Sequence, residues 1–509
     1  MKRTGLSRTV FAFLSGTLLF FFSCRQKIAE GLLIENIRII SGTGEQTDMP
    51  QFVWIKKGVI FSVTSKRPSA HFQEDSILDG TGKFLIPGLI DAHVHLFVIP
   101  GMNGRLANAH PALRDSFRTQ LPKSYLYYGF TTLADLGERY GMERFLAAPV
   151  RPDIIHCDYP LTQANGYGMT FDTGPERYDD HPNFLWDDRQ RADIPAKFNK
   201  TEHLPPALVE KVRKNGGSLV KVKYEDGFGG IFNWPNPAAE TIRQVVQESH
   251  AMGLPVALHA NSLRAYQFGL ETGVDFFTHG LWHWGDLDNA PALPAEVRKI
   301  LDRVIDSGIG VMPTMRVIQG ERDFLAKNFL QDPALKNSVP AALLDWYRSE
   351  EGGWYEPELN ELYESNAKLI ARKFGYTRLQ ESKLPVIDVY VRQLETVVRY
   401  LSEKKARFLF GSDTPSGPSY ANPAGYNGFL EMKQLVAAGL NLRQLFEALT
   451  INNARALHIQ DAVGVIEPGK KAHLLILNRN PFESIEAYNT IETVIVRGVP
   501  YQRNNFKAN

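Results

Sequence analysis

The feature that most constrains the fold is a regular alternation of short apolar runs with longer amphipathic stretches between residues 87 and 460. Residues 218–223 form one apolar run, residues 237–252 have a helical periodicity, and residues 254–259 form the next run. Such alternation is typical of strands and helices that build a parallel sheet with both faces covered. We therefore expect an α/β fold, and a (β/α)8 TIM-type barrel fits this pattern best.

The predicted barrel is longer than the roughly 250 residues that are typical of this fold, so we expect it to carry insertions. Residues 162–205 are rich in Asp, Asn, Gly and Pro, and residues 318–401 have a helical pattern. Short β-branched and aliphatic runs occur on either side of the barrel, in residues 31–86 and 461–509. We expect these two terminal segments to form one small β-sandwich domain beside a barrel of residues 87–460.

The first residues resemble an export signal. Lys2, Arg3 and Arg8 precede an apolar run over residues 10–22, which is too short to cross a bilayer as a helix. The residues before Cys24 resemble the lipobox of bacterial lipoproteins, so we expect residues 1–23 to be removed and Cys24 to carry acyl chains. The protein would then be anchored in a bacterial cell envelope, in the periplasm or at the outer membrane. A secretory signal followed by release is the alternative.

The net charge of the chain helps to predict which class of partner it binds. The 509 residues include 57 Lys and Arg against 56 Asp and Glu, which gives a formal net charge of +1. Nucleic-acid binding needs clustered cationic side chains, and the sequence has no long basic run. We therefore expect a small-molecule partner and no nucleic acid. A homo-oligomer is compatible with the sequence.

A His-x-His pair follows the first apolar run of the predicted barrel. Side chains alternate between the two faces of a strand, so His93 and His95 point the same way and can chelate one metal ion. The pair alone is weak evidence, because two core or surface histidines would look the same. His259, His279 and Asp413 stand at the ends of later predicted strands. Barrel active sites collect residues from carboxyl strand ends, so all five are candidate metal ligands.

Several segments of the chain occur in a specific order and spacing. They are IPGLIDAHVHL, YGFTTLADLG, PVALHA, FFTHG, FLFGSDT, NNARALHI and VGVIEPGKKAHLLIL. Together they resemble the metal-dependent hydrolases of the amidohydrolase superfamily, most closely the branch of imidazolonepropionase-like proteins and metal-dependent prolidases. The resemblance covers nearly the whole chain after the signal. It implies that His93, His95, His259, His279 and Asp413 bind metal, and that a lysine of the fourth strand bridges two ions.

Lys221 and Lys223 are the candidates for this lysine. They are two residues apart, so both face the barrel interior and strand alternation does not choose between them. Residues 216–220 resemble the small and then aliphatic residues that precede the lysine in the family, which favours Lys221. A buried lysine readily loses its proton, and the neutral amine can add carbon dioxide to form a carbamate. The alternative is a structural lysine paired with Glu225 or Asp226.

The predicted cofactors are two divalent metal ions bridged by carbamylated Lys221. Imidazole, carboxylate and carbamate ligands without thiolate favour zinc, and they also suit manganese, cobalt or iron. A water shared by two such ions is a hydroxide near pH 7. Asp413 is expected to take a proton from this water and to deliver it to the leaving nitrogen. Asp413 and Lys221 are therefore the predicted catalytic residues.

Four residues near the expected mouth of the barrel are candidates for binding substrate: Tyr167, Tyr224, His283 and Arg316. Tyr167 stands where prolidase-like relatives carry a histidine; it can donate one hydrogen bond but has no cationic form. Arg316 can bind a substrate carboxylate through two hydrogen bonds, and a loop salt bridge is the alternative. For His283 the alternative is packing between two flanking tryptophans.

The predicted function is metal-dependent hydrolysis of an amide or peptide C–N bond, in a dipeptide or an N-acyl amino acid. Hydrolysis of a cyclic amide, a lactone or a phosphotriester is an alternative, because the same hydroxide attacks each of these electrophiles. An alternative of another class is a lipid-anchored binding protein that has lost catalysis. The presence of every predicted ligand in the sequence argues against it.

Overall fold

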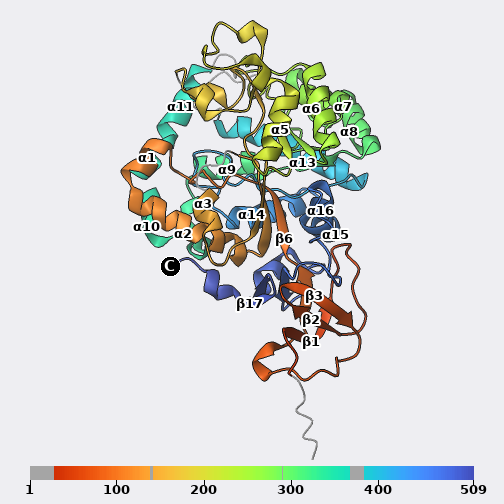
Figure 1. The fold of residues 1–509 in the computed structure, drawn as a ribbon. Coiled ribbons are helices and arrows are strands. Elements are labelled where there is room, and N and C mark those ends of the chain that lie inside the picture. Colours follow the sequence, from red (N-terminus) through yellow and green to blue (C-terminus); the bar gives the residue numbers. More distant parts are fainter. Residues whose placement is uncertain (1–27, 138–141, 173, 289, 367–382) are drawn as a thin grey trace, which may run out of the picture.

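The computed structural model describes residues 28–137, 142–172, 174–288, 290–366 and 383–509 (Figure 1). These residues form a larger part with parallel strands and surrounding helices, and a smaller sheet at one end of it. The predicted signal peptide and the predicted lipidation site lie outside the described residues.

The parallel strands of the larger part form one ladder of three strands and one of four. In chain order they are β6 (Leu89–Val94), β7 (Phe130–Asp135), β8 (Asp153–His156), β11 (Val220–Lys223), β12 (Val256–His259), β13 (Phe276–Phe277) and β14 (Gly310–Val311). A further parallel segment, residues 406–412, lies between the two ends of this arrangement. Phe408 of this segment makes an isolated bridge with Val311, and Thr414, which follows the segment, makes one with Val94.

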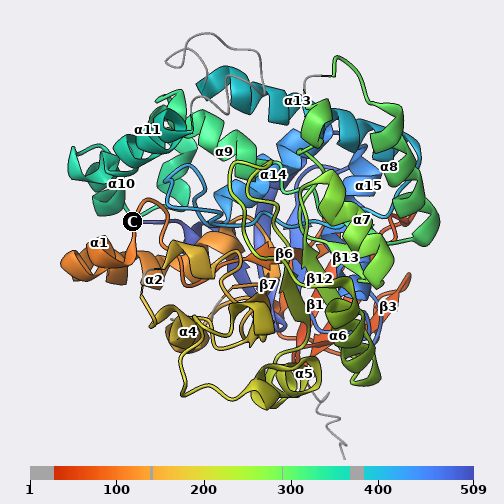
Figure 2. The same ribbon diagram turned by 90° about the horizontal axis from the view of Figure 1, so that it is seen from above.

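This arrangement is a TIM-barrel-type fold of mixed α/β content. Figure 2 shows β6, β7, β12 and β13 near the centre with helices around them. The hydrogen-bonded ladder is not continuous around the barrel. Residues 406–412 do not form a regular strand, and between β8 and β11 there is an isolated bridge from Leu161 to Val222 instead of a strand pair. The predicted barrel is therefore confirmed as a type of fold, and its closure by eight regular strands is not.

The helices lie outside the strands and in the connections. They are α1 (Gly104–Ala109), α2 (Pro111–Tyr127), α3 (Met142–Leu146), α4 (Arg177–Asp180), α5 (Pro205–Lys214), α6 (Ala239–Ala251), α7 (Leu263–Thr272), α8 (Ala295–Ser307), α9 (Arg316–Leu325), α10 (Ala341–Tyr347), α11 (Tyr355–Ser365), α13 (Lys383–Glu403), α14 (Tyr426–Ala437), α15 (Leu442–Glu447) and α16 (Asn453–Ala456). Among the helices in the described part of the chain, none combines the length and apolar character that a membrane crossing requires.

Local sequence explains where these elements begin and end. Helix α7 begins after Ser262, whose hydroxyl accepts a hydrogen bond from the backbone N–H of Ala265 over 3.1 Å. It ends at Gly273, which has a φ of 77° that favours glycine. Every residue of β12 is buried, as expected for a parallel strand covered on both faces.

The smaller sheet draws on both terminal segments of the chain. Its strands are β1 (Leu32–Ile39), β2 (Gln51–Lys56), β3 (Val59–Thr64), β4 (Ile77–Asp79), β5 (Phe84–Pro87), β15 (Leu474–Leu477), β16 (Ile491–Val496) and β17 (Val499–Gln502). Strand β5 pairs with β1 on one side and with β15 on the other, so the two segments enter a single sheet of eight strands. The predicted two-sheet sandwich is therefore not confirmed.

The connection between the two parts sets the direction of the barrel. Strand β5 ends at Pro87 and β6 begins at Leu89, so the amino end of β6 adjoins the small sheet. The carboxyl end of β6, which leads to His93 and His95, points away from that sheet. The predicted insertions contain short elements: residues 162–205 hold β9 (Thr162–Gln163), β10 (Phe184–Leu185), α4 and short 3-10 turns.

Candidate metal centre

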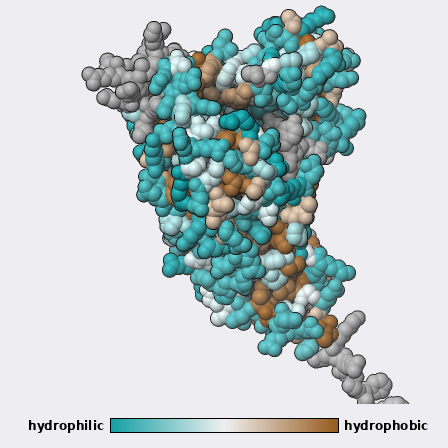
Figure 3. All heavy atoms as spheres, turned by 90° about the vertical axis from the view of Figure 1, so that its left-hand side faces the viewer, coloured by the Kyte–Doolittle hydropathy of each residue, from teal (hydrophilic) through white to brown (hydrophobic). Residues whose placement is uncertain are grey.

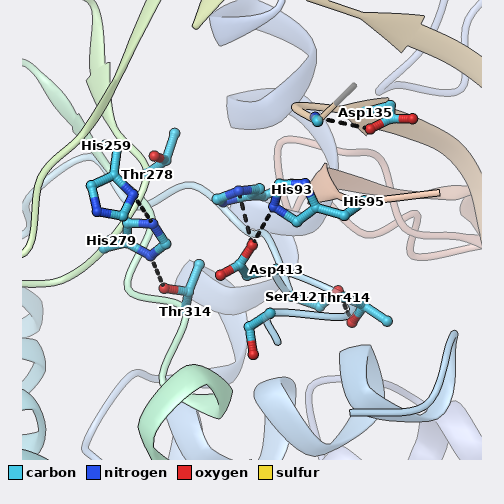
Figure 4. Close-up of polar contacts among 12 residues, drawn as sticks. His93, His95, Asp135, His259, Thr278, His279, Thr314, Ser412, Asp413 and Thr414 are labelled. Carbon is cyan, nitrogen blue, oxygen red and sulfur yellow. Dashed lines mark hydrogen bonds and ion pairs between the residues drawn. The ribbon is translucent and has the colours of Figure 1, made fainter. Parts of the chain in front are cut away.

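The structure brings the five predicted metal ligands together at the carboxyl ends of the barrel strands (Figure 4). His93 is on β6 and His95 follows it directly, His259 ends β12, His279 follows β13, and Asp413 follows the segment 406–412. Four of them are buried, and the side chain of His95 is 21% exposed. The site therefore has one side open toward the mouth of the barrel.

His93, His95 and Asp413 form the first group of ligands. The Nε2 atoms of His93 and His95 lie 3.0 Å and 2.8 Å from the same oxygen, Oδ1 of Asp413. The backbone holds this geometry, because the N–H of Asp413 donates to the carbonyl of His93 over 2.8 Å. Three ligand atoms from two neighbouring segments thus converge on one point.

His259 and His279 form the second group. Nδ1 of His259 lies 2.9 Å from Nε2 of His279. Nε2 of His259 donates to Oε2 of Glu225 over 2.9 Å, because a carboxylate only accepts hydrogen bonds. This contact leaves the lone pair of His259 on Nδ1, where it faces His279. Nδ1 of His279 is held by the hydroxyl of Thr314 at 2.8 Å.

The donor atoms of the two groups fit a metal ion. Ligand atoms of His93, His279 and Asp413 all lie within 4.8 Å of one another. The ligand atoms of one tetrahedral zinc are roughly 3.4 Å apart, so this spacing brings the two groups close enough to hold neighbouring ions. The set contains imidazole nitrogens and carboxylate oxygens without thiolate, which suits zinc and its neighbours.

Burial sets the charge of these groups. It lowers the pKa of His93 to about 3, although Asp413 opposes the shift, and it holds the pKa of His279 well below the usual value. Burial acts to raise the pKa of Asp413, but His93 and His95 outweigh it and keep that pKa well below its usual range. Neutral imidazoles and an ionised carboxylate at neutral pH are the states in which these side chains bind metal.

Lys221 lies beside the centre. Its side chain is buried at 2% exposure, and its Nζ donates to the hydroxyl of Thr278. Burial lowers the pKa of Lys221 to about 7, against the effect of Asp413, so a large fraction of the amine is neutral near pH 7. The charge of Lys221 in turn lowers the pKa of His93, His259 and His279, so the amine is within electrostatic range of both ligand groups.

The alternative partners of Lys221 are engaged elsewhere. Glu225 accepts hydrogen bonds from His259 and from Nδ2 of Asn261, the latter over 2.7 Å. Asp226 accepts from the hydroxyl of Ser262 over 2.6 Å. The structure therefore favours the reading of Lys221 as a neutral, buried amine over a lysine in a structural ion pair.

Glu225 is a buried partner of the predicted ligand His259, and the sequence did not predict this contact. Its carboxylate is fully buried, and the second oxygen accepts the backbone N–H of Phe228 over 2.9 Å. It fixes the tautomer and the ring direction of His259, as acidic partners of metal-binding histidines do. Strand register is the signal that could have found it: Lys223 pairs with His259, so Glu225 follows at the same strand end.

Tyr167 is the predicted substrate residue that lies against a metal ligand. Its ring centroid is 4.7 Å from that of His259, with an angle of 33° between the planes. On its other sides it contacts Phe228 at 5.9 Å and Trp234 at 5.6 Å. Tyr167 thus forms part of an aromatic wall beside the second ligand group.

Tyr224 lies elsewhere, and its predicted role at the mouth is corrected. It is buried, and its ring packs on Phe268 of α7 with 4.4 Å between centroids. The reason is strand alternation, because Lys221, Lys223 and Glu225 occupy the inner face and Tyr224 takes the outer one. Tyr224 belongs to the layer between β11 and the helices.

Arg316 is also corrected. The predicted contact with a substrate carboxylate is replaced by contacts inside the protein, since the side chain is only 1% exposed. Its guanidinium forms an ion pair with Asp323 and donates to Oδ1 of Asn427 over 3.0 Å and to the carbonyl of Ala421 over 2.8 Å. The alternative of a salt bridge within the protein therefore describes Arg316 better.

Asn427 connects Arg316 to the metal centre. Its Nδ2 donates to the carbonyl of Ser412 over 3.1 Å and to the hydroxyl of Thr414 over 2.9 Å. These two residues flank Asp413, which has a φ of 49°. Few non-glycine residues adopt this conformation, so the neighbouring contacts help to hold it.

His283 is buried one aromatic layer away from the centre. Its ring lies 4.5 Å from that of Tyr390 and 6.0 Å from that of Trp282. Trp282 in turn lies 5.5 Å from His279. These packing contacts link His283 to His279 through the ring of Trp282, and its role in substrate binding stays a prediction.

Comparisons with known proteins concern the family and the fold of the chain. The model of the amidohydrolase family matches residues 84–281 and 343–500. An N-acetylglucosamine-6-phosphate deacetylase from Lysinibacillus sphaericus is 39% identical over 64 residues, which is 13% of this chain and 15% of that protein. An imidazolonepropionase from Picrophilus torridus is 37% identical over 70 residues, 13% of this chain and 18% of its own. Both relatives are thus matched over less than a fifth of their length.

The fold comparison extends over nearly the whole chain. The crystal structure of a Xaa-Pro dipeptidase with bound methionine matches with a TM-score of 0.61 and 19% identity. The match covers 92% of this chain and 99% of the dipeptidase. The predicted resemblance is confirmed, and the chain belongs to the amidohydrolase family.

Proposed function

We propose that this protein is a metal-dependent hydrolase that cleaves an amide C–N bond, in a dipeptide or an N-acyl amino acid. The observation that carries the proposal is the convergence of four histidines and Asp413 at the carboxyl ends of the barrel strands. Two divalent ions, zinc in the first instance, are the proposed cofactors. The first would be held by His93, His95 and Asp413, and the second by His259 and His279.

Lys221 is the proposed bridge between the two positions. Its neutral amine can add carbon dioxide, and the resulting carbamate would offer one oxygen to each ion. The burial of Lys221 and its electrostatic coupling to both ligand groups support this role. The carbamate would also supply part of the negative charge that two adjacent cations require.

Individual residues have separate proposed roles in the hydrolysis. Bound divalent ions supply a Lewis acid and lower the pKa of water toward neutrality. Asp413 accepts a proton from the attacking water at its carboxylate and delivers it to the leaving nitrogen. Glu225 and Thr314 keep the rings of His259 and His279 in place. Tyr167 is placed to contact a substrate that approaches the His259 side.

Lipid anchoring in a bacterial cell envelope is part of the proposal. It is supported by the lipobox-like residues before Cys24 and by the charged and apolar segments that precede them. Acylation at Cys24 would hold the enzyme at a membrane surface.

Elemental analysis of the purified protein tests the metal centre. We expect about two equivalents of a divalent metal in the parent protein, and a loss of one or both in Lys221→Ala and His93→Ala. Lys223→Ala is the matched control, since Lys223 lies on the same strand face and should leave the content unchanged. One equivalent that survives Lys221→Ala would favour a mononuclear centre, and a folded protein without metal would refute the proposal. A panel of dipeptides, N-acyl amino acids and cyclic amides then separates the substrate classes.

A further inference from the structure

An apolar patch lies on the β2–β3 hairpin of the small sheet. Phe61 is 52% exposed and Val59 is 36% exposed, although both are large apolar residues. The ring of Trp54 packs edge-on against Phe61, with 4.8 Å between centroids. Together with Lys56, which lies next to both rings, these residues are called the hairpin patch.

The hairpin patch is not needed for the core of the sheet. Ile55 and Ile60 point to the opposite face of the hairpin and are almost fully buried there. Alternation along both strands therefore leaves Trp54 and Phe61 on the outer face. A sheet that covers its core with one face usually carries polar residues on the other, so exposed aromatic side chains indicate a contact surface.

The chemistry of the patch fits a lipid surface. Nζ of Lys56 lies 3.7 Å from the ring centroid of Trp54 and 3.9 Å from that of Phe61. Lys57 follows at the exposed turn of the hairpin. Indole rings favour the interface between water and hydrocarbon, and lysines beside them attract anionic headgroups.

The start of the described chain runs along the same surface. The indole N–H of Trp54 donates to the carbonyl of Glu30 over 3.0 Å, and Glu30 lines a shallow hollow with Lys56, Val59 and Phe61. Ile28, at the start of this segment, is 52% exposed. Glu30, six positions after the predicted lipidation site, therefore lies beside the hairpin patch.

Chain length limits how far this surface can lie from the anchor. Cys24 precedes Ile28 by four residues, which span at most about 14 Å when fully extended. Acyl chains on Cys24 would thus keep the hairpin patch close to the headgroups of the membrane. We propose that the hairpin patch rests on the membrane surface, so that the enzyme is docked there as well as tethered.

Docking through this sheet fixes the orientation of the active site. The amino end of β6 adjoins the small sheet, and His93 and His95 lie at the other end of the strand. Figure 1 shows β1, β2 and β3 at one end of the molecule and the connections around α5 and α11 at the other. In Figure 3 brown, hydrophobic atoms gather at the end with the small sheet. The mouth of the barrel would face away from the membrane and receive substrate from the aqueous phase.

The proposal rests on the proposed acylation of Cys24 and is independent of the hydrolytic activity. It is tested with full-length protein processed in a bacterial host and reconstituted into vesicles of phosphatidylethanolamine and phosphatidylglycerol. An environment-sensitive fluorophore is attached to Ser62→Cys, next to Phe61, and in a second protein to Ser365→Cys in α11. Cys157 is buried, so it should not compete for the label. Mass spectrometry of the amino terminus reports whether Cys24 is acylated.

We expect the probe at position 62 to shift to shorter wavelength on vesicles and to be quenched by nitroxide-labelled lipids at least two-fold more than the probe at position 365. Adding Phe61→Ser and Val59→Ser should remove this difference while acylation persists. Equal quenching at both positions in acylated protein would overturn the docking and leave only a tether. A blue shift without vesicles that grows with protein concentration would show that a second copy covers the patch instead. An unacylated Cys24 would overturn docking and anchor together, without affecting the metal content or hydrolysis.

Discussion

The imidazoles of His259 and His279 point ring nitrogens at each other, with 2.9 Å between Nδ1 and Nε2. The other nitrogen of each ring is held by the protein, in His259 by Glu225 and in His279 by Thr314. Both rings therefore keep their direction through contacts that do not involve the ligand position itself. The fold thus fixes the direction of these two predicted ligands, and partners of this kind contribute to the affinity of a metal site.

Replacing Glu225 tests this preparation. Glutamine has one acceptor oxygen where glutamate has two, so Glu225→Gln places an N–H₂ group against a donor from His259, Asn261 or Phe228. We expect metal affinity to fall by roughly 10- to 100-fold. Titration calorimetry with zinc or cobalt measures it, and the absorption spectrum of bound cobalt reports the changed coordination.

Asp226→Asn is the matched control for Glu225→Gln. Asp226 is the adjacent acid, and its contact is to the hydroxyl of Ser262 rather than to a metal ligand. Its replacement should leave metal affinity within about two-fold, because the effect on coordination falls off outside the direct partners of the ligands. Equal losses in both variants would assign the effect of Glu225 to the general stability of the loop.

A second prediction concerns the chemical state of Lys221. If its amine carries a carbamate, protein loaded with metal in ¹³C-labelled bicarbonate should show a carbamate carbonyl signal in the ¹³C NMR spectrum. Lys221→Ala should lack the signal and Lys223→Ala should retain it, because Lys221 contacts Thr278 beside both ligand groups, whereas the Nζ of Lys223 lies over the ring of Tyr167. A short carboxylic acid should restore part of the second metal equivalent in Lys221→Ala, since it supplies the missing oxygens. A signal that persists in Lys221→Ala would place the carbamate elsewhere.

Side chains alternate between the two faces of a strand, and this rule explains which site residues could be predicted from the sequence. It predicted that His93 and His95 point the same way, and in the structure both contact the same oxygen of Asp413. The same rule, applied from Lys221 onward, would have placed Tyr224 outside the barrel. Candidate ligands at strand ends could thus be predicted from the sequence, because the local pattern of apolar residues shows where each strand ends.

Other features depend on contacts between distant segments. Arg316 donates hydrogen bonds to Ala421 and Asn427, which lie more than a hundred positions further along the chain. The burial of Arg316 could therefore not be predicted from the residues around it in the sequence. The small sheet shows the same limit. Alternating runs indicated that both terminal segments contain strands, but the insertion of β5 between β1 and β15 unites them in one sheet. Pairing partners are chosen by the packed structure and not by the period of each strand.

Arg316 supports a third prediction. Arg316→Met should lower the free energy of unfolding by about 2–4 kcal/mol, because it leaves the buried Asn427 without its donor and the partly exposed Asp323 without its cation. Chemical denaturation by urea measures the change. Arg322→Ala is the control: Arg322 is exposed and pairs with Asp388, so its loss should cost about 1 kcal/mol or less. A similar small cost for Arg316→Met would show that the contacts of its guanidinium are replaceable.

A fourth prediction follows from Asp153, at the start of β8, which joins the barrel to the carboxyl-terminal segment. Its carboxylate accepts hydrogen bonds from Lys471 over 2.7 Å and from Arg497 over 2.5 Å, and Nε2 of His473 lies 3.2 Å away. Burial acts to raise the pKa of Asp153, but His473 and Lys471 outweigh it and hold the pKa well below its usual range. The ionised form is thus favoured by the folded state.

The stabilisation by Asp153 should depend on pH with a defined sign. A carboxyl group whose pKa is lowered by folding stabilises the protein above its unfolded pKa of 3.8 and loses this effect as the pH falls toward its folded value. Asp153→Asn should therefore lower the free energy of unfolding at pH 7 by roughly 1–3 kcal/mol, and the difference from the parent should shrink below about pH 4. Asp79→Asn is the control: Asp79 ends β4 in an exposed position and accepts hydrogen bonds from Thr81, so its replacement should change stability in the same direction but by a smaller amount. Urea unfolding at pH 7 and pH 3 gives the comparison; an equal difference at both would mean that Asp153 acts through its shape and hydrogen bonds rather than through its charge.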